Sequence, residues 1–180
     1  MSAKFGPIGV MTVSDRVFQG EYEDLGGPAV CQWLRPRLLD PIEFEQVTVP
    51  DELDQVCESL NDMATRCALV VTTGGTGIGP RDITPEAMTL CCDRILPGFG
   101  EKMRADSWEA VPTAILSRAA AGLIDSCLVI NLPGNPKAVD ECLEAIWPAI
   151  PHAVEIAGGS IGKIKDAAES PHPHGESSSS

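Results

Sequence analysis

The sequence predicts an α/β fold with three layers, in which a mainly parallel sheet is flanked by helices. Three short and almost continuously apolar runs, at residues 8–13, 68–73 and 127–132, are typical of strands buried on both faces of such a sheet. Helical patterns separate these runs, and strands that alternate with helices favour parallel pairing through right-handed crossovers. With 180 residues, of which 43% are hydrophobic, the chain is long enough to bury a sizeable core.

The first half of the chain supplies a fourth strand and two helices. Residues 42–49 alternate between apolar and polar side chains, which predicts a strand nearer an edge of the sheet. A helix is expected at residues 28–39, after a turn with two glycines. Another is expected at residues 51–66, where acidic residues lie in the first turn and apolar residues recur at helical spacing.

The second half of the chain is expected to form shorter helices, interrupted by turns and prolines. Three short helices or turns are expected at residues 85–93, 99–108 and 113–121. A further helix begins at Lys137 and should kink or restart at Pro148 and Pro151, because proline disrupts a helix interior. From about residue 158 the composition becomes rich in glycine, proline and serine. We therefore expect one domain at residues 1–162 and a flexible tail at residues 163–180.

Composition restricts the classes of function. The net charge of −13 argues against a nucleic-acid surface, and no apolar run is long enough for a membrane span. The seven cysteines show no CxxC spacing, and most lie in apolar or helical surroundings. They are typical of reduced core residues, which together with an amino-terminal segment unlike a signal peptide predicts a cytoplasmic protein.

The most informative segment is TTGGTGIGPRDITPEA, at residues 72–87. Its glycines permit a tight turn that presents backbone N–H groups, and Thr84 followed by Pro85 predicts an N-cap and a first helical turn. Such a helix start favours an anion, and Asp82 beside it suggests Mg²⁺ between acid and phosphate. Alone, the segment fits equally well a connection whose glycines serve only the turn. Arg81 stands where a Walker motif would need lysine.

Four predicted strands end in residues suited to ligand binding. Parallel strands place their carboxyl ends at one edge of the sheet, where ligands bind in open α/β folds. At the last strand, Asn135 can cap a helix whose first residue is Pro136, as predicted for Thr84 and Pro85. The segments that would meet at this edge are Ser14–Arg16, Pro50–Asp51, Gly74–Gly77 with Arg81 and Asp82, and Asn131–Lys137.

Together these segments predict a site for a phosphate-bearing ligand and Mg²⁺. Taken singly, each has a structural explanation: Asp15 can pair with Arg16, Asp51 can be a helix-start acid, and Asn135 can be only a cap. No Ser/His/Asp or Cys/His nucleophile set is visible. The pattern therefore favours phosphoryl or nucleotidyl transfer, in which positioning and charge neutralisation dominate.

The combination of motifs resembles the MogA-type molybdenum-cofactor proteins, which include the G domains of plant proteins and of gephyrin. The resemblance spans most of the chain and implies a MogA-like fold, a homotrimer, and molybdopterin adenylyltransferase activity with ATP, molybdopterin and Mg²⁺. The matching segments are TVSDR (residues 12–16), VPDE (49–52), the glycine-rich segment (72–87), LPGFGEKMR (96–104), PTAILSRAAAG (112–122) and NLPGNPKAVDECLEA (131–145).

The resemblance also implies roles for individual residues. It assigns Asp51 and Asp82 to catalysis and to Mg²⁺–ATP positioning, with Glu101 and Lys102 as weaker candidates. Arg81 either adds positive charge to the site or pairs with Asp82. The residues implied to bind nucleotide and pterin phosphates, or to line the pterin site, are Ser14, Asp15, Gly74, Gly75, Thr76, Gly77, Ser117, Arg118, Pro133, Gly134 and Asn135.

Related proteins provide alternatives. MoaB-type proteins share much of the pattern, and a MoaB-like binder or a gephyrin-like scaffold would hold molybdopterin without turnover. A molybdenum-insertion protein of the MoeA type is an expected partner, and the serine-rich tail also fits a domain cut from such a fusion. Because both Asp51 and Asp82 are present, the sequence favours the enzyme.

Overall fold

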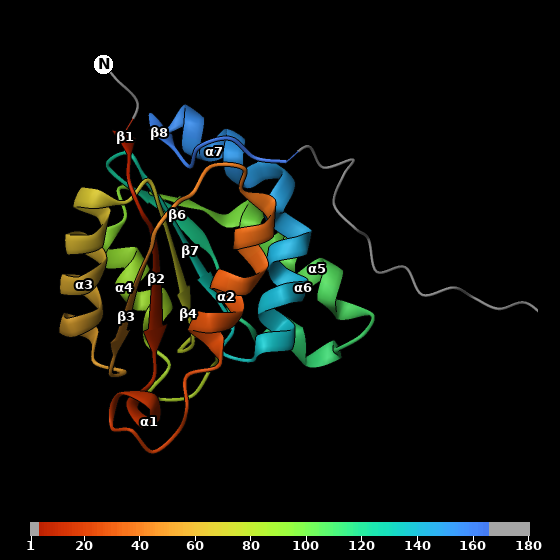
Figure 1. Cartoon of the computed structure of the whole chain (residues 1–180). Helices are drawn as coiled ribbons and strands as arrows, with labels where there is room; N and C mark the ends of the chain where they lie inside the picture. Colours follow the sequence, from red (N-terminus) through yellow and green to blue (C-terminus); the bar gives the residue numbers. More distant parts are fainter. Residues whose placement is uncertain (1–3, 166–180) are drawn as a thin grey trace, which may run out of the picture.

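A computed structural model describes residues 4–165 and contains a central six-stranded sheet (Figure 1). The strand order is β3-β2-β4-β7-β6-β5. The first four strands in this order are parallel, whereas β6 is antiparallel to both β7 and β5. The strands are β2 (Ile8–Val13), β3 (Phe44–Val49), β4 (Leu69–Thr73), β5 (Arg94–Leu96), β6 (Ala121–Ile124) and β7 (Cys127–Leu132).

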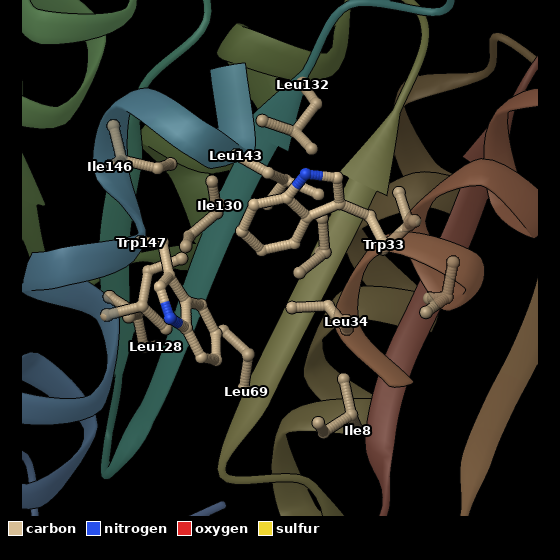
Figure 2. Close-up of a cluster of buried hydrophobic side chains, with 14 of the residues drawn as sticks. Ile8, Trp33, Leu34, Leu69, Leu128, Ile130, Leu132, Leu143, Ile146 and Trp147 are labelled. Carbon is tan, nitrogen blue, oxygen red and sulfur yellow. The ribbon is translucent and has the colours of Figure 1, made fainter. Parts of the chain in front are cut away.

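Helices cover both faces of the sheet, so the predicted three-layer α/β fold is confirmed. Helices α3 (Leu53–Arg66) and α4 (Thr84–Cys91) pack on one face, and α2 (Gly26–Leu34), α5 (Pro97–Trp108) and α6 (Pro136–Ile146) pack on the other (Figure 1). The larger apolar layer lies under α2 and α6 (Figure 2). There the rings of Trp33 and Trp147 meet edge to face, with centroids 5.6 Å apart.

Most predicted elements lie where the sequence places them. The strand predicted near an edge is β3, the edge strand, and the helix predicted at 51–66 is α3. Helix α2 begins two residues before its predicted start and continues as a 3₁₀ turn at Arg35–Arg37. As predicted from the two prolines, α6 ends before a 3₁₀ turn at Trp147–Ala149, and α7 (Ile150–Ile156) restarts the helix.

The sequence does not predict the antiparallel pairing of β5 with β6. Residues 113–121 were expected to form a helix or turn. Instead, a 3₁₀ helix at Pro112–Leu116 is followed by extended chain that enters β6. Alanines favour a helix locally, but the backbone of Ala121–Ile124 pairs with β7, and tertiary pairing overrides local propensity.

The amino ends of the strands are closed by short pieces of chain. Strand β1 (Lys4–Phe5) pairs with β8 (Gly159–Ser160), and residues 163–165 hydrogen-bond to residues 37–40. The start of the predicted tail therefore lies against the domain, while residues 166–180 are outside the described residues. Among residues 4–165, no helix is long and apolar enough to span a membrane.

Candidate active site

A cavity of about 900 Å³ opens at the carboxyl ends of the four parallel strands. This volume lies within the roughly 300–1,000 Å³ that is typical of small-molecule sites. The loops after β2, β3, β4 and β7 all contribute to its wall, as the sequence predicts. Of the predicted site residues, those that line the cavity are Ser14, Asp15, Asp51, Gly74, Gly75, Thr76, Gly77, Asp82, Ser117, Pro133, Gly134 and Asn135.

Asp15 and Asp51 join the ends of β2 and β3 by a reciprocal pair of hydrogen bonds. The Asp15 N–H donates to Oδ2 of Asp51 over 2.8 Å, and the Asp51 N–H donates to Oδ1 of Asp15 over 3.0 Å. Burial raises the pKa of the Asp51 carboxyl, and the nearby charges of Asp15 and Asp82 act in the same direction. In these two bonds each carboxylate uses one oxygen, so its other oxygen is free of the Asp15–Asp51 pair. Repulsion among the three acidic side chains favours a cation between them.

The glycine-rich segment folds back on itself directly after β4. Gly74 has φ of +97° and Gly75 has φ of +63°, which is the left-handed region that favours glycine. Space is also restricted: a Cβ on Gly75 would lie 2.4 Å from the Thr84 hydroxyl and 3.1 Å from Oδ1 of Asp51. These two glycines therefore allow the loop to pass close to the Asp51 carboxylate.

Thr84 closes the base of this loop. Its N–H donates to the Gly75 carbonyl over 3.0 Å, and its hydroxyl donates to the Gly74 carbonyl over 2.9 Å. The predicted N-cap role of Thr84 is therefore wrong, because the helix already begins at Thr84 and Ile83 occupies the cap position without a side-chain bond. The buried hydroxyl holds the loop rather than the helix end.

Asp82 closes a tight turn within the glycine-rich loop by two hydrogen bonds with Gly79. Its Oδ2 accepts the Gly79 N–H over 2.7 Å, and its own N–H donates to the Gly79 carbonyl over 3.0 Å. The Asp82 side chain also lines the cavity. Asp51 and Asp82, the two predicted catalytic acids, therefore both line the cavity, and the charge of Asp82 contributes to the raised pKa of Asp51.

Two arginines supply the cationic side chains among the described residues that line the cavity. Arg81 forms a two-pronged ion pair with Asp15, with bonds of 2.9 and 3.0 Å, and also bonds Glu52 over 2.9 Å. The predicted pairing of Arg81 with Asp82 is therefore wrong, because its partners are Asp15 and Glu52. The guanidinium of Arg16 lies 4.6 Å from the ring centre of Tyr22.

The turn after β7 lies beside the glycine-rich loop and also lines the cavity. The side chain of Asn135 accepts the Lys137 N–H over 2.9 Å, and Pro136 occupies the first turn of α6, which confirms the predicted cap. The Thr73 hydroxyl donates to the Pro133 carbonyl over 2.8 Å and joins this turn to the end of β4. The two neighbouring loops are therefore fixed to each other as well as to their strands.

Of the site residues predicted between positions 96 and 118, all within the described part of the chain, only Ser117 lines the cavity. The guanidinium of Arg118 lies against the glycine-rich loop, where it bonds the carbonyls of Gly77 and Asp82. Lys102 pairs with Asp106 on the exposed surface of α5, and neither Lys102 nor Glu101 is among the described residues that line the cavity.

Sequence reasoning missed most of the segment between α1 (Asp15–Phe18) and α2. Tyr22 and Asp24 line the cavity, and Tyr22 is the one aromatic side chain among the described lining residues. Asp24 accepts the Thr12 hydroxyl over 2.7 Å and the Gly27 N–H over 3.0 Å, which anchors the segment to β2 and α2. An acid two residues before a helix that starts with Gly-Gly was the available signal.

The donors in the cavity suit Mg²⁺. Asp51 and Asp82 offer carboxylate oxygens, the ligand type that this hard cation takes, and two carboxylates are its usual protein contribution when phosphates and waters complete the shell. Among residues 4–165, no group of three or more His, Cys, Asp or Glu side chains is placed to hold a metal ion. The site can thus neutralise a polyphosphate through a shared cation, two arginines and backbone N–H groups.

Comparisons with known proteins agree with this arrangement. Residues 9–152 match the model of a family described as a probable molybdopterin binding domain. The chain is 51% identical over 161 residues to the molybdopterin adenylyltransferase of Helicobacter pylori, covering 88% of this chain and 92% of that protein. It is 41% identical over 168 residues to the enzyme of the same name from Escherichia coli, covering 84% and 85%.

Solved structures give the same result for the fold. The molybdopterin biosynthesis enzyme MoaB of Thermus thermophilus superposes with a TM-score of 0.79 at 39% identity, covering 88% of this chain and 99% of that chain. The molybdopterin biosynthesis Mog protein of Mycobacterium ulcerans gives a TM-score of 0.77 at 33% identity, with coverage of 84% and 99%. The chain therefore belongs to the molybdopterin-binding domain family, within its MogA- and MoaB-like members.

Proposed function

We propose that this protein is a molybdopterin adenylyltransferase of molybdenum cofactor biosynthesis. It transfers AMP from Mg²⁺–ATP to molybdopterin and releases pyrophosphate. The observation that carries the proposal is the convergence of Asp51, Asp82 and the closed glycine-rich loop on one cavity of about 900 Å³. Relatives that cover most of this chain and most of their own length bear the name molybdopterin adenylyltransferase.

The reaction joins two polyanions. An oxygen of the terminal phosphate of molybdopterin attacks the α-phosphorus of ATP and forms a new P–O bond. The bond from the α-phosphorus to the bridging oxygen breaks, and that oxygen leaves as part of pyrophosphate. The nucleophile is already an anion, so proton removal contributes little, and repulsion between the phosphates is the main barrier.

The residues of the cavity act on that repulsion. Asp51 and Asp82 would hold Mg²⁺, which when bound neutralises charge on the triphosphate. Arg81 reaches over the cavity edge from the loop, and its partners Asp15 and Glu52 keep its guanidinium close to the incoming phosphates. The reciprocal bonds between Asp15 and Asp51 keep the carboxylate of Asp51 in place before any ligand binds, which reduces reorganisation in the reaction.

Finer properties are proposed on the resemblance to the family. We propose a homotrimer, a cytoplasmic location, and delivery of the adenylylated product to a molybdenum-insertion protein of the MoeA type. The alternative of binding without turnover is less favoured, because both acidic residues that the reaction needs are present and face the cavity. The gephyrin of Dictyostelium discoideum, 38% identical over 158 residues, matches this chain over only 22% of its own length.

The test is direct assay of the purified chain with molybdopterin and Mg²⁺–ATP, with AMP-linked pterin and pyrophosphate followed by chromatography. Equal amounts of both products, formed only when Mg²⁺ is present, are expected. The Asp82→Asn variant serves as the inactive control. Tight binding of molybdopterin without product would overturn the transferase and leave a binder.

A further inference from the structure

Arg118 makes three hydrogen bonds to the glycine-rich loop, two from its guanidinium and one from its backbone. Its Nε donates to the Gly77 carbonyl over 2.7 Å, and its Nη2 donates to the Asp82 carbonyl over 2.7 Å. Its backbone N–H donates to the Thr76 carbonyl over 2.9 Å. One residue of the segment before β6 therefore holds both arms of the loop, at residues 76–77 and at residue 82.

The fourth contact of Arg118 fixes its own position. Nη1 forms an ion pair with Glu86 in the first turn of α4, and this guanidinium lowers the pKa of the Glu86 carboxyl. Glu86 begins the same helix whose Thr84 closes the base of the loop. The loop is thus tied at its base by Thr84 and across its middle by Arg118, and both ties lead to α4.

The geometry of Asp82 depends on this middle tie. The Asp82 side chain is oriented by the Gly79 N–H within the loop, whereas its backbone is held from outside by Arg118. If the bonds from Arg118 were lost, residues 77–82 would be held to the rest of the described structure only by the ion pairs of Arg81. The side chain of Arg81 is exposed. A shift of about 1 Å in a catalytic group reduces rate by about 100-fold.

We propose that Arg118, held by Glu86, is a positioning residue that sets the place of Asp82 and of the loop amides around the triphosphate, and does not contact substrate. This inference rests on the proposed function and departs from the role that the family resemblance implied, in which Arg118 lines the pterin site. The planar guanidinium donates in three directions at once, to two carbonyls and a carboxylate. An ammonium group on a flexible stem cannot reproduce that fork.

The test compares Arg118→Gln, Arg118→Lys and Glu86→Gln with a matched control, Arg66→Gln. Arg66 also pairs with two carboxylates, those of Glu45 and Asp62, but it lies at the end of α3 away from the cavity. Each purified variant is assayed for kcat, for KM with each substrate and for the Mg²⁺ concentration that gives half-maximal rate. Hydrogen exchange at residues 76–83 is measured without any ligand.

Arg118→Gln should lower kcat about 10- to 100-fold and raise the half-maximal Mg²⁺ concentration about ten-fold, as is usual when a partner behind a metal ligand is removed. Amide exchange at residues 76–83 should accelerate, while the melting temperature and the exchange of β2 and β7 stay near wild type. Arg118→Lys should recover part of the rate, Glu86→Gln should have a smaller effect in the same direction, and Arg66→Gln should have none.

Three outcomes would overturn the proposal. A rise of ten-fold or more in KM for molybdopterin at unchanged kcat, about 1.4 kcal/mol, would mean that Arg118 contacts the pterin. Loss of rate in proportion to loss of folded protein, at an unchanged Mg²⁺ midpoint, would make it merely structural. Unchanged exchange at residues 76–83 would show that the loop does not need it. Because the exchange experiment needs no turnover, it tests whether Arg118 holds the loop even if the wild-type chain proves inactive and the proposed function fails.

Discussion

Two turns of this molecule share a sequence pattern and use it differently. After β4, Thr84 and Pro85 open α4, and after β7, Asn135 and Pro136 open α6. Asn135 is exposed and caps its own helix by accepting the Lys137 N–H. Thr84 is buried and points its hydroxyl back along the chain to the Gly74 carbonyl. One polar side chain stabilises a helix, and the other closes a loop.

The residues before each pair explain the difference. Gly74 and Gly75 adopt positive φ and turn the chain so that their carbonyls face the start of α4, within reach of Thr84. Pro133 and Gly134 instead lead straight from β7 into α6, and their turn is held by the Thr73 hydroxyl. A polar residue before proline is therefore a helix signal in both places, but its partner is decided by the backbone that precedes it.

The largest expected effect is on the chemistry that the closed loop supports. Asp82→Asn keeps an oxygen that can accept the Gly79 N–H, so the loop should close as in the wild type. The negative charge is lost, and turnover should fall by at least about 100-fold, because a group that acts on developing charge is removed. Product formation and the melting temperature should be measured together. A variant that adenylylates at the wild-type rate would contradict the assigned role of Asp82.

Gly75→Ala should break the loop at its base. The substitution places a methyl group 2.4 Å from the Thr84 hydroxyl in a residue with φ of +63°. Left-handed backbone costs about 1–2 kcal/mol and the added crowding about 1–3 kcal/mol more, with activity lost as the loop moves away from Asp51. Denaturant unfolding and kcat are the measurements.

The matched control for this prediction is Gly20→Ala. Gly20 has φ of +75°, but no atom lies within 4 Å of the Cβ that alanine would add. The control should therefore show the backbone cost alone and keep full activity. Equal destabilisation by the two substitutions would mean that contact with Thr84 does not restrict Gly75.

Thr84→Val should have the next largest effect. Valine has nearly the same shape but no hydroxyl, so the Gly74 carbonyl loses the donor that closes the loop, at a cost of about 1–2 kcal/mol. Activity should fall with stability, because the loop carries Asp82, and Thr84→Ser should restore both. If Thr84→Val were destabilised while its kcat remained at wild type, the closure of the loop would be irrelevant to catalysis.

The fold and the cap were predictable because local signals and tertiary structure agree there. Apolar runs such as residues 8–13 bury both faces in a parallel sheet, and their carboxyl ends meet wherever the helices pack. Asn135 followed by Pro136 needs no distant partner to form a cap. These features depend on neighbours along the chain, so one sequence suffices to predict them.

The remaining features depend on residues that are distant in sequence. Arg118 lies 41 positions from the Gly77 carbonyl that it bonds, so its direction could not be deduced from a short motif. The role of Thr84 required knowledge of the φ angles at Gly74 and Gly75. Residues 121–124 carry no strong strand pattern, and they form a strand through their backbone pairing with β7 and the burial of Ala121 and Ile124. In each case a long-range contact decided between local alternatives of similar energy.

The smallest effect is expected at Asn135, and it separates the two turns most clearly. Asn135→Ala removes the cap of α6 and should cost about 1 kcal/mol with kcat nearly unchanged, because no catalytic carboxylate belongs to this turn. Asn135→Asp keeps a capping oxygen and should retain stability, but it adds a negative charge to the cavity wall and should raise KM for ATP. Unfolding free energies and KM values of the two variants therefore report on different properties of one side chain. If Asn135→Ala lowered kcat as strongly as Thr84→Val, the β7–α6 turn would take part in positioning the reacting groups, and the distinction between a helix-capping turn and a loop-closing turn would fail.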